Sequence, residues 1–265
     1  MGSLRAALRS HWPEYLIEGG CLGLYMLSAL SFTALLQHPR SPLRAAVPDP
    51  LLRRMWIGLA LGATVIALVY SPFGKRSGAH FNPAMTFAFF RLGKVAGPDA
   101  LLYACSQFGG AALGAILGSL LLGARVADPS VAWVVTKPGM FGAAAAFAAE
   151  VAIACGLMLV ALLSSNSRRT HRFTGLFCGL LIATYITFET PISGMSLNPA
   201  RTLGSAAVAH VFDSLWIYFT APPLGMLIAA EIYLRLRGGA GVRCAKLHHQ
   251  NAERCIFRCG WAACA

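Results

Sequence analysis

Charged side chains are scarce in this chain of 265 residues. Asp, Glu, Lys and Arg make up 12% of the sequence, whereas soluble domains contain about 25% charged residues. With 57% hydrophobic residues, the chain is also too apolar for a disordered protein. The 8 cysteines are too few for a secreted scaffold held by disulfides. These shortages exclude a soluble enzyme, a disordered chain and a disulfide-rich secreted domain.

Long apolar runs dominate what is present. A bilayer core about 30 Å thick requires about 20 apolar residues for each helix that crosses it. Six runs of roughly this length predict an all-α membrane protein with six spans. The predicted spans are 15–36, 51–70, 99–122, 140–163, 173–188 and 214–234. The first run begins only after Pro13 and lacks a small-residue cleavage pattern, so it predicts a span rather than a signal peptide.

Positive charge is distributed unevenly over the connections between these spans. The formal net charge is +12 at pH 7. With the N-terminus in the cytoplasm, 15 of the 22 Lys and Arg residues fall in cytoplasmic segments, six fall in outer loops and Arg201 falls in neither. Because cytoplasmic loops carry the excess of Lys and Arg, this bias predicts a multi-pass protein of the cell membrane with both termini in the cytoplasm. The charge therefore indicates a lipid bilayer, rather than nucleic acid, as the partner.

The sequence contains an internal repeat. Residues 77–87 and 193–203 share six of eleven positions at an offset of 116, and Glu18 in the first span matches Glu150 in the fourth. We therefore expect one transmembrane domain, residues 1–236, built from a first repeat of about 14–122 and a second of about 140–236. A tail at 237–265 follows. Because each repeat has an odd number of spans, the second repeat must be inverted relative to the first.

Each copy contains an Asn-Pro-Ala motif. Asn is a strong helix N-cap and Pro suits the first helical position, so Asn82-Pro83-Ala84 and Asn198-Pro199-Ala200 predict two helix starts. About ten apolar residues follow each motif, which is enough for about half the bilayer. Two inverted half-helices would meet near the midplane, where their converging dipoles repel cations and free Asn amide hydrogens orient water. One motif alone predicts only an ordinary cap, but the doubling favours a shared site.

These features resemble the aquaporin, or major intrinsic protein, family. The resemblance covers about residues 14–236 and rests on SGAHFNPA, on SGMSLNPART and on a glutamate in the first span of each repeat. It implies a six-helix bundle with two re-entrant half-helices, a pore through every protomer and a homotetramer. It also implies transport without covalent chemistry, and hence neither an enzyme nor a bound cofactor. In aquaporin-type channels, pore diameter, lining donors, an Arg and half-helix dipoles set the selectivity.

The resemblance also implies a narrow selectivity filter. Arg201 occupies the position of the pore arginine, and ungapped alignment to the motifs adds Gly62, Ile186 and Met195. A charge at membrane depth costs at least about 2.5 kcal/mol, so a functional Arg201 is the leading interpretation, and an Arg reaching the outer interface is the alternative. Gly62 and Ile186 replace the aromatic and His of water-specific members, which favours a wider opening, whereas Thr202 favours water. A close helix contact explains Gly62 as well as a filter role does.

Four other ionisable residues in or near the spans need a role. Glu18 and Glu150 are expected to accept hydrogen bonds from the backbone of the re-entrant loops, and a proton relay is the alternative. His80 is predicted to face the cytoplasmic vestibule, as either a structural or a pH-responsive side chain. Glu189 is predicted to be an acceptor in the outer vestibule.

Small residues recur within two of the spans. Such stripes predict that the helix backbones approach one another closely and build the bundle rather than the pore. The residues are Gly19, Gly20 and Gly23 in the first span, and Gly110, Gly114 and Gly118 in the third.

The tail lies beyond the resemblance. Five residues of metal-ligating types lie at short spacings that match no standard zinc finger: Cys244, His248, His249, Cys255 and Cys259. They make a zinc site one interpretation. S-acylation of a cysteine on this basic segment is a second, and an unstructured cytosolic tail is the default.

The sequence thus predicts a passive channel that conducts water and excludes ions and protons, with the passage of small neutral solutes left open. A glycerol and small-solute facilitator of the same family is the nearest alternative. An ion-coupled secondary transporter also uses inverted repeats and broken helices, but it predicts a titratable site at the midplane. A non-transporting adhesion or scaffolding protein on the same bundle predicts no flux.

Overall fold

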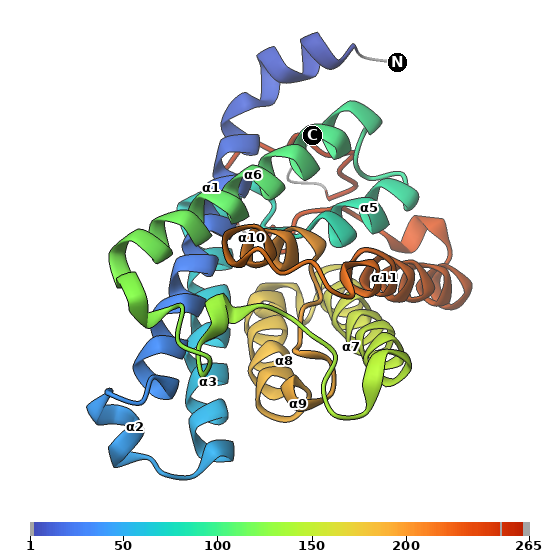
Figure 1. The fold of residues 1–265 in the computed structure, drawn as a ribbon. Coiled ribbons are helices and arrows are strands. Elements are labelled where there is room, and N and C mark those ends of the chain that lie inside the picture. Colours follow the sequence, from blue (N-terminus) through green and yellow to red (C-terminus); the bar gives the residue numbers. More distant parts are fainter. Residues whose placement is uncertain (1–2, 250, 262–265) are drawn as a thin grey trace.

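Long helices run across the molecule where the apolar runs predict them. A computed structural model describes residues 3–249 and 251–261 of the chain. The long helices are α1 (Leu4–Gln37), α3 (Pro50–Tyr70), α6 (Gly97–Leu122), α7 (Gly142–Ser165), α8 (Thr174–Phe188) and α11 (Leu215–Arg237) (Figure 1). Five of the described helices are long and apolar enough to cross a membrane by length and composition, and α8 is the shorter sixth.

The first helix differs most from its predicted bounds. It begins at Leu4 and continues through Pro13, whereas the hydrophobic run predicts a start at residue 15. Ser3 caps the helix by accepting a hydrogen bond from the backbone N–H of Ala6 at 3.2 Å. The intervening Leu, Arg and Ala residues are good helix formers, so the helix extends beyond its apolar part. Hydrophobicity therefore marks the membrane-crossing part of α1 but not its end.

The order of elements repeats. The first half contains α1, α3, the short α4 (Pro72–Ser77), the half-helix α5 (Pro83–Arg91) and α6. The second half contains α7, α8, the short α9 (Thr190–Ser193), the half-helix α10 (Pro199–Ala209) and α11. The connection between the halves, 123–139, contains two short 3₁₀ helices, η1 (Gly123–Arg125) and η2 (Ala132–Val134). The doubling seen in the sequence is therefore present in the fold.

The two halves interlock. Within each half the first span packs along the last, α1 on α6 and α7 on α11, while α3 of one half packs along α8 of the other. Each half-helix also reaches across the molecule, because α5 packs on α11 and α10 packs on α6. The half-helices are consequently enclosed by spans from both repeats.

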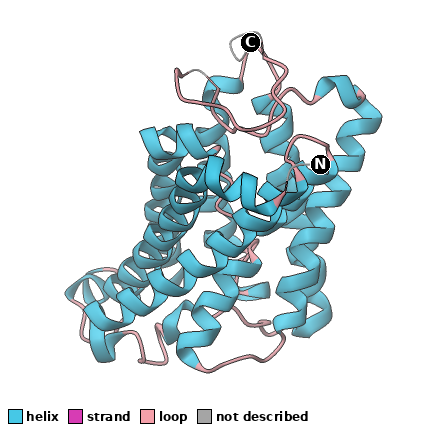
Figure 2. Ribbon diagram, turned by 90° about the horizontal axis from the view of Figure 1, so that it is seen from above, coloured by secondary structure: helices cyan, strands magenta, loops and turns pink. Residues whose placement is uncertain are grey.

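Both chain ends lie on one side of the bundle. Figure 1 shows the N and C labels in the upper part of the molecule, whereas α2 (Pro42–Ala46) and α9 lie in the lower part. Figure 2 shows that the loops of the tail gather beside the chain ends. We call the side with the chain ends the terminal face and the other side the loop face. After α11 the chain forms η4 (Gly239–Gly241) and then a non-helical segment on the terminal face.

The glycine stripes bring α1 and α6 into backbone contact. A Cβ atom at Gly110 would overlap the carbonyl oxygen of Gly19, and one at Gly114 would overlap that of Gly23. By contrast, a Cβ at Gly20 or Gly109 would have no neighbour within 4 Å. A Cβ at Gly118 would also meet α1, at the Leu30 side chain, so Gly20 is the one stripe residue outside the helix contact that small residues allow.

Gly110→Ala should destabilise the bundle, whereas Gly109→Ala should not. The added methyl group at position 110 meets backbone atoms that cannot move away, and overpacking of this kind costs about 1–3 kcal/mol or more. Thermal unfolding of the purified variants in detergent measures the effect. We expect a lower midpoint for Gly110→Ala and a wild-type midpoint for Gly109→Ala. Equal midpoints for the two variants would show that this contact does not hold α1 to α6.

Candidate functional site

The two half-helices begin at the Asn-Pro pairs. Asn82 caps α5, since its Oδ1 accepts from the N–H of Ala84 at 2.9 Å. Asn198 caps α10, since its Oδ1 accepts from the N–H groups of Ala200 at 3.0 Å and Arg201 at 3.2 Å. Pro83 and Pro199 occupy the first helical positions, where the missing N–H leaves no bond unmade.

The capping side chains also link the two repeats. Asn82 Nδ2 donates to the carbonyl of Leu197 at 2.8 Å, and Asn198 Nδ2 donates to the carbonyl of Phe81 at 2.7 Å. Each amide nitrogen carries two hydrogens, so each link leaves one hydrogen for the pore. The sequence interpretation left both hydrogens free, which did not anticipate this pair of reciprocal bonds. The two positive helix ends are thus held face to face.

The loops before the half-helices carry matched backbone strain. Ala79 and Phe81 in the first loop have φ of 62° and 49°, and Met195 and Leu197 in the second have φ of 51° and 61°. A non-glycine residue in this left-handed region costs free energy and persists only where its surroundings hold it. The two loops have the same conformation at the same offset, so the same kind of support is required in both.

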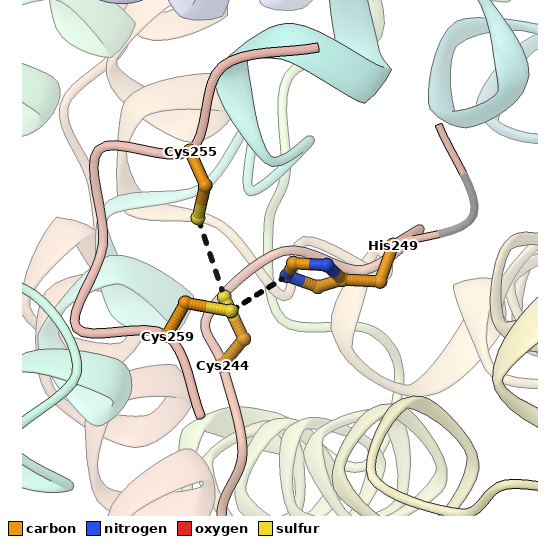
Figure 3. Close-up of side chains that lie close together, drawn as sticks. All are labelled: Cys244, His249, Cys255 and Cys259. Carbon is orange, nitrogen blue, oxygen red and sulfur yellow. Dashed lines mark hydrogen bonds between the residues drawn. The ribbon is translucent and has the colours of Figure 1, made fainter. Parts of the chain in front are cut away.

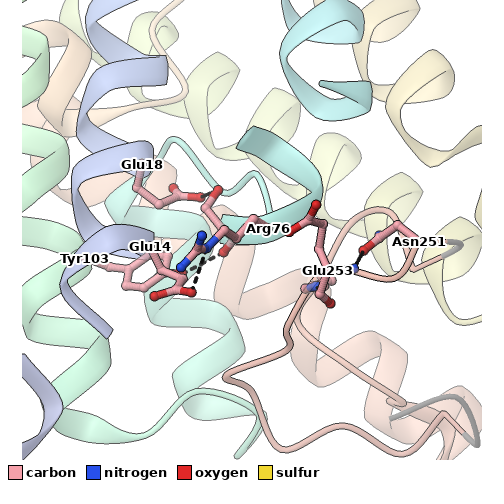
Figure 4. Close-up of polar contacts among 8 residues, drawn as sticks. Glu14, Glu18, Arg76, Tyr103, Asn251 and Glu253 are labelled. Carbon is pink, nitrogen blue, oxygen red and sulfur yellow. Dashed lines mark hydrogen bonds and ion pairs between the residues drawn. The ribbon is translucent and has the colours of Figure 1, made fainter. Parts of the chain in front are cut away.

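Glu18 supplies this support in the first repeat. Its carboxylate accepts from the N–H of His80 at 3.1 Å, from the N–H of Phe81 at 2.7 Å and from Ser77 Oγ at 2.8 Å. Gln107 Nε2 donates to the same carboxylate at 2.9 Å. Figure 4 shows Glu18 on α1 close to Tyr103 of α6. Glu18 is fully buried, so these donors replace the water that a carboxylate would otherwise bind.

Glu150 repeats this arrangement in the second half. It accepts from the N–H of Ser196 at 2.6 Å, from the N–H of Leu197 at 2.8 Å and from Ser193 Oγ at 2.7 Å. Both carboxylates thus bind loop backbone, the geometry expected of a loop-supporting role.

A pair of tyrosines completes the support and was missed from the sequence. Tyr103 donates to the carbonyl of Ser77 and Tyr218 donates to the carbonyl of Ser193, both at 2.6 Å. The two tyrosines lie at equivalent positions of α6 and α11, with an offset of 115. A search of the last span of each repeat for matched polar residues could have found them.

A cavity of about 70 Å³ passes between the two Asn caps. It is lined by side chains of both repeats, among them Val65, Asn82, Leu157 and Asn198. A second cavity of about 300 Å³ opens towards the loop face. The residues that line both cavities mark the boundary between them, and they are Tyr25, Met195 and Arg201. This boundary is the outer constriction of the candidate pore.

Arg201 is held at the constriction from two sides. Its Nη1 donates to the carbonyl of Val134 in η2 at 2.8 Å, and its backbone N–H donates to the Asn198 cap. Ile186, on α8, lines the cavity on the loop face together with Arg201 and Met195. Three of the four predicted filter residues therefore lie together.

Gly62 lies elsewhere, which contradicts its predicted place in the filter. It lines neither cavity, and a Cβ at this position would lie 2.5 Å from the carbonyl oxygen of Gly179 on α8. Gly62 therefore belongs to the contact between α3 and α8, the alternative that the sequence left open. The neighbouring Leu61 and Val65 face the cavities instead. Tyr25 of α1, which carries no motif, takes part in the constriction in place of Gly62.

His80 and Glu189 lie near opposite ends of the pore. His80 lines the cavity towards the terminal face, and it is 3% exposed. Its Nδ1 lies 3.1 Å from Thr86 Oγ1 and its Nε2 lies 2.9 Å from the carbonyl oxygen of Ala245. Glu189 caps the end of α8 and is 7% exposed, but it lines neither cavity. The structure therefore does not place Glu189 in the outer vestibule.

The described residues of the tail pack against the channel loops, which contradicts the default expectation of an unstructured segment. Four of its five candidate ligands converge: Cys244, His249, Cys255 and Cys259 (Figure 3). His248 is not among them, because its ring packs against Tyr70 at a centroid distance of 5.1 Å. A hydrogen bond with Cys244 and a further one with His249 lower the pKa of the Cys255 thiol, against the opposing effect of burial.

Comparison with known proteins decides the family. The family model described as "Major intrinsic protein" matches residues 21–233, most of the chain. The chain belongs to the major intrinsic protein family. Its members are channels rather than enzymes, and the sequence prediction of this family is therefore confirmed.

Plant members of the major intrinsic protein family are similar in sequence. "Probable aquaporin NIP7-1" of Arabidopsis thaliana is 36% identical over 173 residues, which cover 65% of this chain and 61% of that protein. "Aquaporin NIP1-4" of Oryza sativa is 34% identical over 183 residues, covering 68% of this chain and 64% of that protein. The match thus spans less than two thirds of the length of these relatives.

A solved member of the major intrinsic protein family has the same fold. The aquaglyceroporin from Plasmodium falciparum superimposes with a TM-score of 0.70 at 20% sequence identity. The superposition covers 84% of this chain and 96% of that chain. The predicted fold class, an all-α membrane protein with two re-entrant half-helices, is confirmed.

Proposed function

We propose that this protein is a passive channel for water that also conducts small uncharged solutes and excludes ions and protons. The observation that carries the proposal is the meeting of two capped half-helices in a continuous cavity that ends at Arg201. Asn82 and Asn198 each retain one amide hydrogen beyond the bonds that join the repeats. A water molecule between them accepts these hydrogens with its oxygen.

Charge exclusion follows from the same geometry. The N-terminus of a helix carries about half a positive charge, so α5 and α10 together repel a cation from the point where they meet. The Arg201 guanidinium adds a full positive charge at the outer constriction. A neutral molecule experiences neither repulsion, which favours water and uncharged solutes over ions.

The outer constriction suits solutes that are partly apolar. Met195 at the constriction presents thioether surface and Ile186 in the adjoining loop-face cavity presents hydrocarbon surface, while the guanidinium of Arg201 supplies hydrogen-bond donors. A polyol such as glycerol has one face of C–H groups and another of hydroxyls, and this wall can accommodate both. The likeness to proteins called aquaporins and to an aquaglyceroporin is in keeping with this substrate class.

We place the terminal face in the cytoplasm. The Lys and Arg residues of the N-terminal helix, of the loops on that face and of the tail form the larger share of the 22 basic residues. The same proposal puts the protein in the cell membrane as a homotetramer, with one pore in each copy. The family resemblance supports the tetramer, and chemical cross-linking of the purified protein would test it.

Stopped-flow light scattering of proteoliposomes tests the proposed function. A higher sucrose concentration outside should shrink vesicles that contain the protein faster than empty vesicles, and a higher glycerol concentration outside should give the same shrinkage followed by a reswelling phase. Shrinkage no faster than that of empty vesicles, with a metal chelator present as well as without one, would overturn the proposal. Saturable uptake that requires an ion gradient would overturn it in favour of a secondary transporter.

Ile186→His should make the pore more selective for water. The imidazole adds a polar group to the apolar part of the wall and removes the hydrocarbon surface that a C–H face contacts. We expect glycerol reswelling to slow by roughly tenfold, which corresponds to about 1.4 kcal/mol, while water flux changes less. Ile186→Leu, which keeps the apolar surface, is the matched control. Equal loss of glycerol flux in both variants would contradict an effect of polarity.

A further inference from the structure

The tail covers the terminal face of the pore. Three of its backbone N–H groups donate hydrogen bonds to loops of the channel. The N–H of Arg243 donates to Asn166 Oδ1 at 2.6 Å. The N–H of Leu247 donates to the carbonyl of Gly78 at 3.1 Å, and the N–H of Arg258 donates to the carbonyl of Lys94 at 3.0 Å. Gly78 and Lys94 flank the first half-helix, and Asn166 follows α7 in the second repeat. The segment therefore spans connections of both repeats.

Tail side chains also close the pore cavity itself. Leu247 is 3% exposed and is one of the residues that line this cavity. The ring of Phe257 stacks on His80 at a centroid distance of 5.3 Å, and Phe89 of the first half-helix stacks on the same ring at 5.0 Å. Because a carbonyl oxygen only accepts, the contact with Ala245 requires that His80 Nε2 carry its hydrogen. His80 thus binds the tail instead of facing an open vestibule.

This cover has little regular structure of its own. The described residues from 242 to 261 contain neither a helix nor a strand. Their internal backbone bonds are few, such as that from Gly260 N–H to the carbonyl of Arg243 at 2.7 Å. Short segments without a sufficient core are commonly held by disulfides or by a structural metal. The tail is a segment of this kind.

The four converging side chains have the geometry of a metal site. The ligand atoms of Cys244, His249, Cys255 and Cys259 all lie within 4.8 Å of one another (Figure 3). The sulfurs of Cys244 and Cys255 are 3.6 Å apart, and Cys259 Sγ is 3.5 Å from His249 Nε2. Zinc with bonds of about 2.3 Å to sulfur in a tetrahedron has edges of about 3.8 Å, close to these distances.

The ligand chemistry selects the metal. Three thiols and one imidazole form a set that suits Zn²⁺, whereas Mg²⁺ and Ca²⁺ require oxygen ligands. Cys244 and Cys255 are free thiols at a separation too long for a disulfide. Four protein ligands fill a tetrahedral site, as structural zinc requires, and leave no position for a reactive water.

We propose that Cys244, His249, Cys255 and Cys259 bind one zinc ion, which holds the tail across the terminal mouth of the pore and closes it. Release of the metal frees Leu247 from the cavity and Phe257 from the His80 ring, and opens the channel. The metal site stands on the tail geometry alone, whereas the closing role rests on the proposed channel function.

Metal analysis of the full-length protein tests the site. After removal of any affinity tag and purification under reducing conditions, mass spectrometry should find one zinc per chain. Cobalt substitution should produce the visible bands of a tetrahedral thiolate site. His249→Ala and Cys255→Ser should lose the metal, while the matched controls His248→Ala and Cys105→Ser should retain it. Absence of zinc from the wild type, equal zinc in His248→Ala and His249→Ala, or oxidised tail cysteines would overturn the site.

Water flux tests the closing role. Wild-type proteoliposomes loaded with zinc should shrink slowly, and a chelator on both sides of the membrane should accelerate shrinkage several-fold. Vesicles that contain the Cys255→Ser variant should shrink rapidly with or without the chelator. A zinc-containing wild type whose flux does not respond to chelation would overturn the closing role. Absence of flux from both the chelated wild type and Cys255→Ser, with zinc found in the wild type, would instead overturn the channel function.

Discussion

Replacing Arg201 with valine should let protons and alkali cations leak through the pore while water flux persists. The guanidinium lies at the outer constriction, where it is bound by the carbonyl of Val134 at 2.8 Å. A unit charge repels a cation at 4 Å by about 4 kcal/mol at an effective dielectric constant of 20. Removing it therefore raises cation passage by up to roughly a thousandfold, and the half-helix dipoles retain part of the barrier.

A pH-sensitive dye inside proteoliposomes measures the leak, and stopped-flow scattering on the same vesicles measures the water flux. Arg201→Lys is the matched control, because it keeps the positive charge and loses only the planar fork of donors. We expect vesicles with the Arg201→Lys variant to keep the low proton permeability of the wild type. A valine variant as tight as the wild type, or a lysine variant as leaky as valine, would show that this charge does not set the exclusion.

Replacing Glu150 with leucine should abolish the folded channel. The change leaves the N–H groups of Ser196 and Leu197 and the hydroxyl of Ser193 without their buried acceptor. Each unpaired buried group costs about 1–3 kcal/mol, so the three together cost roughly 3–9 kcal/mol. This loss is comparable to the whole stability of a typical protein, about 5–15 kcal/mol. The strained loop at Met195 and Leu197 would then relax away from the pore.

Thermal unfolding in detergent and water flux in vesicles check this expectation. Glu231→Leu is the matched control, since Glu231 is 43% exposed and pairs with Arg91 at the surface, where an ion pair contributes little. Glu150→Gln should have a thermal stability and a water flux between those of the wild type and Glu150→Leu. The Gln amide keeps one acceptor oxygen but places a donor opposite another donor. A Glu150→Leu variant with normal stability and flux would mean that the carboxylate is not what supports the loop.

Local sequence patterns were sufficient for much of this fold. The Asn-Pro pairs define the starts of α5 and α10 because capping depends only on a side chain and the three backbone groups after it. Apolar runs locate the spans because the length of a run can be compared directly with the thickness of the bilayer core. Helix α1 nevertheless extends beyond its apolar run to Leu4. The matched glutamates were recognisable because a buried carboxylate in a span requires partners.

Residues whose role depends on the rotation of one helix against another were harder to assign. Counting back from Asn82 placed Gly62 in the filter, but the contact with Gly179 turns this side of α3 towards α8. The constriction instead includes Tyr25, which no motif marks. The rotation of a helix about its own axis is decided by close packing with neighbouring helices. A single sequence contains no direct record of that packing.

The tail shows the same division. Its composition indicated metal ligands, but only the folded chain distinguishes His249, which joins the cysteines, from the adjacent His248, which packs on Tyr70.

The sequence by itself determined the membrane class, the inverted repeat, the two capped half-helices and the carboxylates beneath them. Each of these follows from hydrophobicity, parity of spans or bonds between near neighbours in the chain. The tertiary structure alone decided the reciprocal bonds between Asn82 and Asn198 and the opposite loops, the makeup of the constriction, and the closure of the pore by the tail. These features join segments that are far apart in sequence, and only the packing of all the helices brings their atoms within bonding distance.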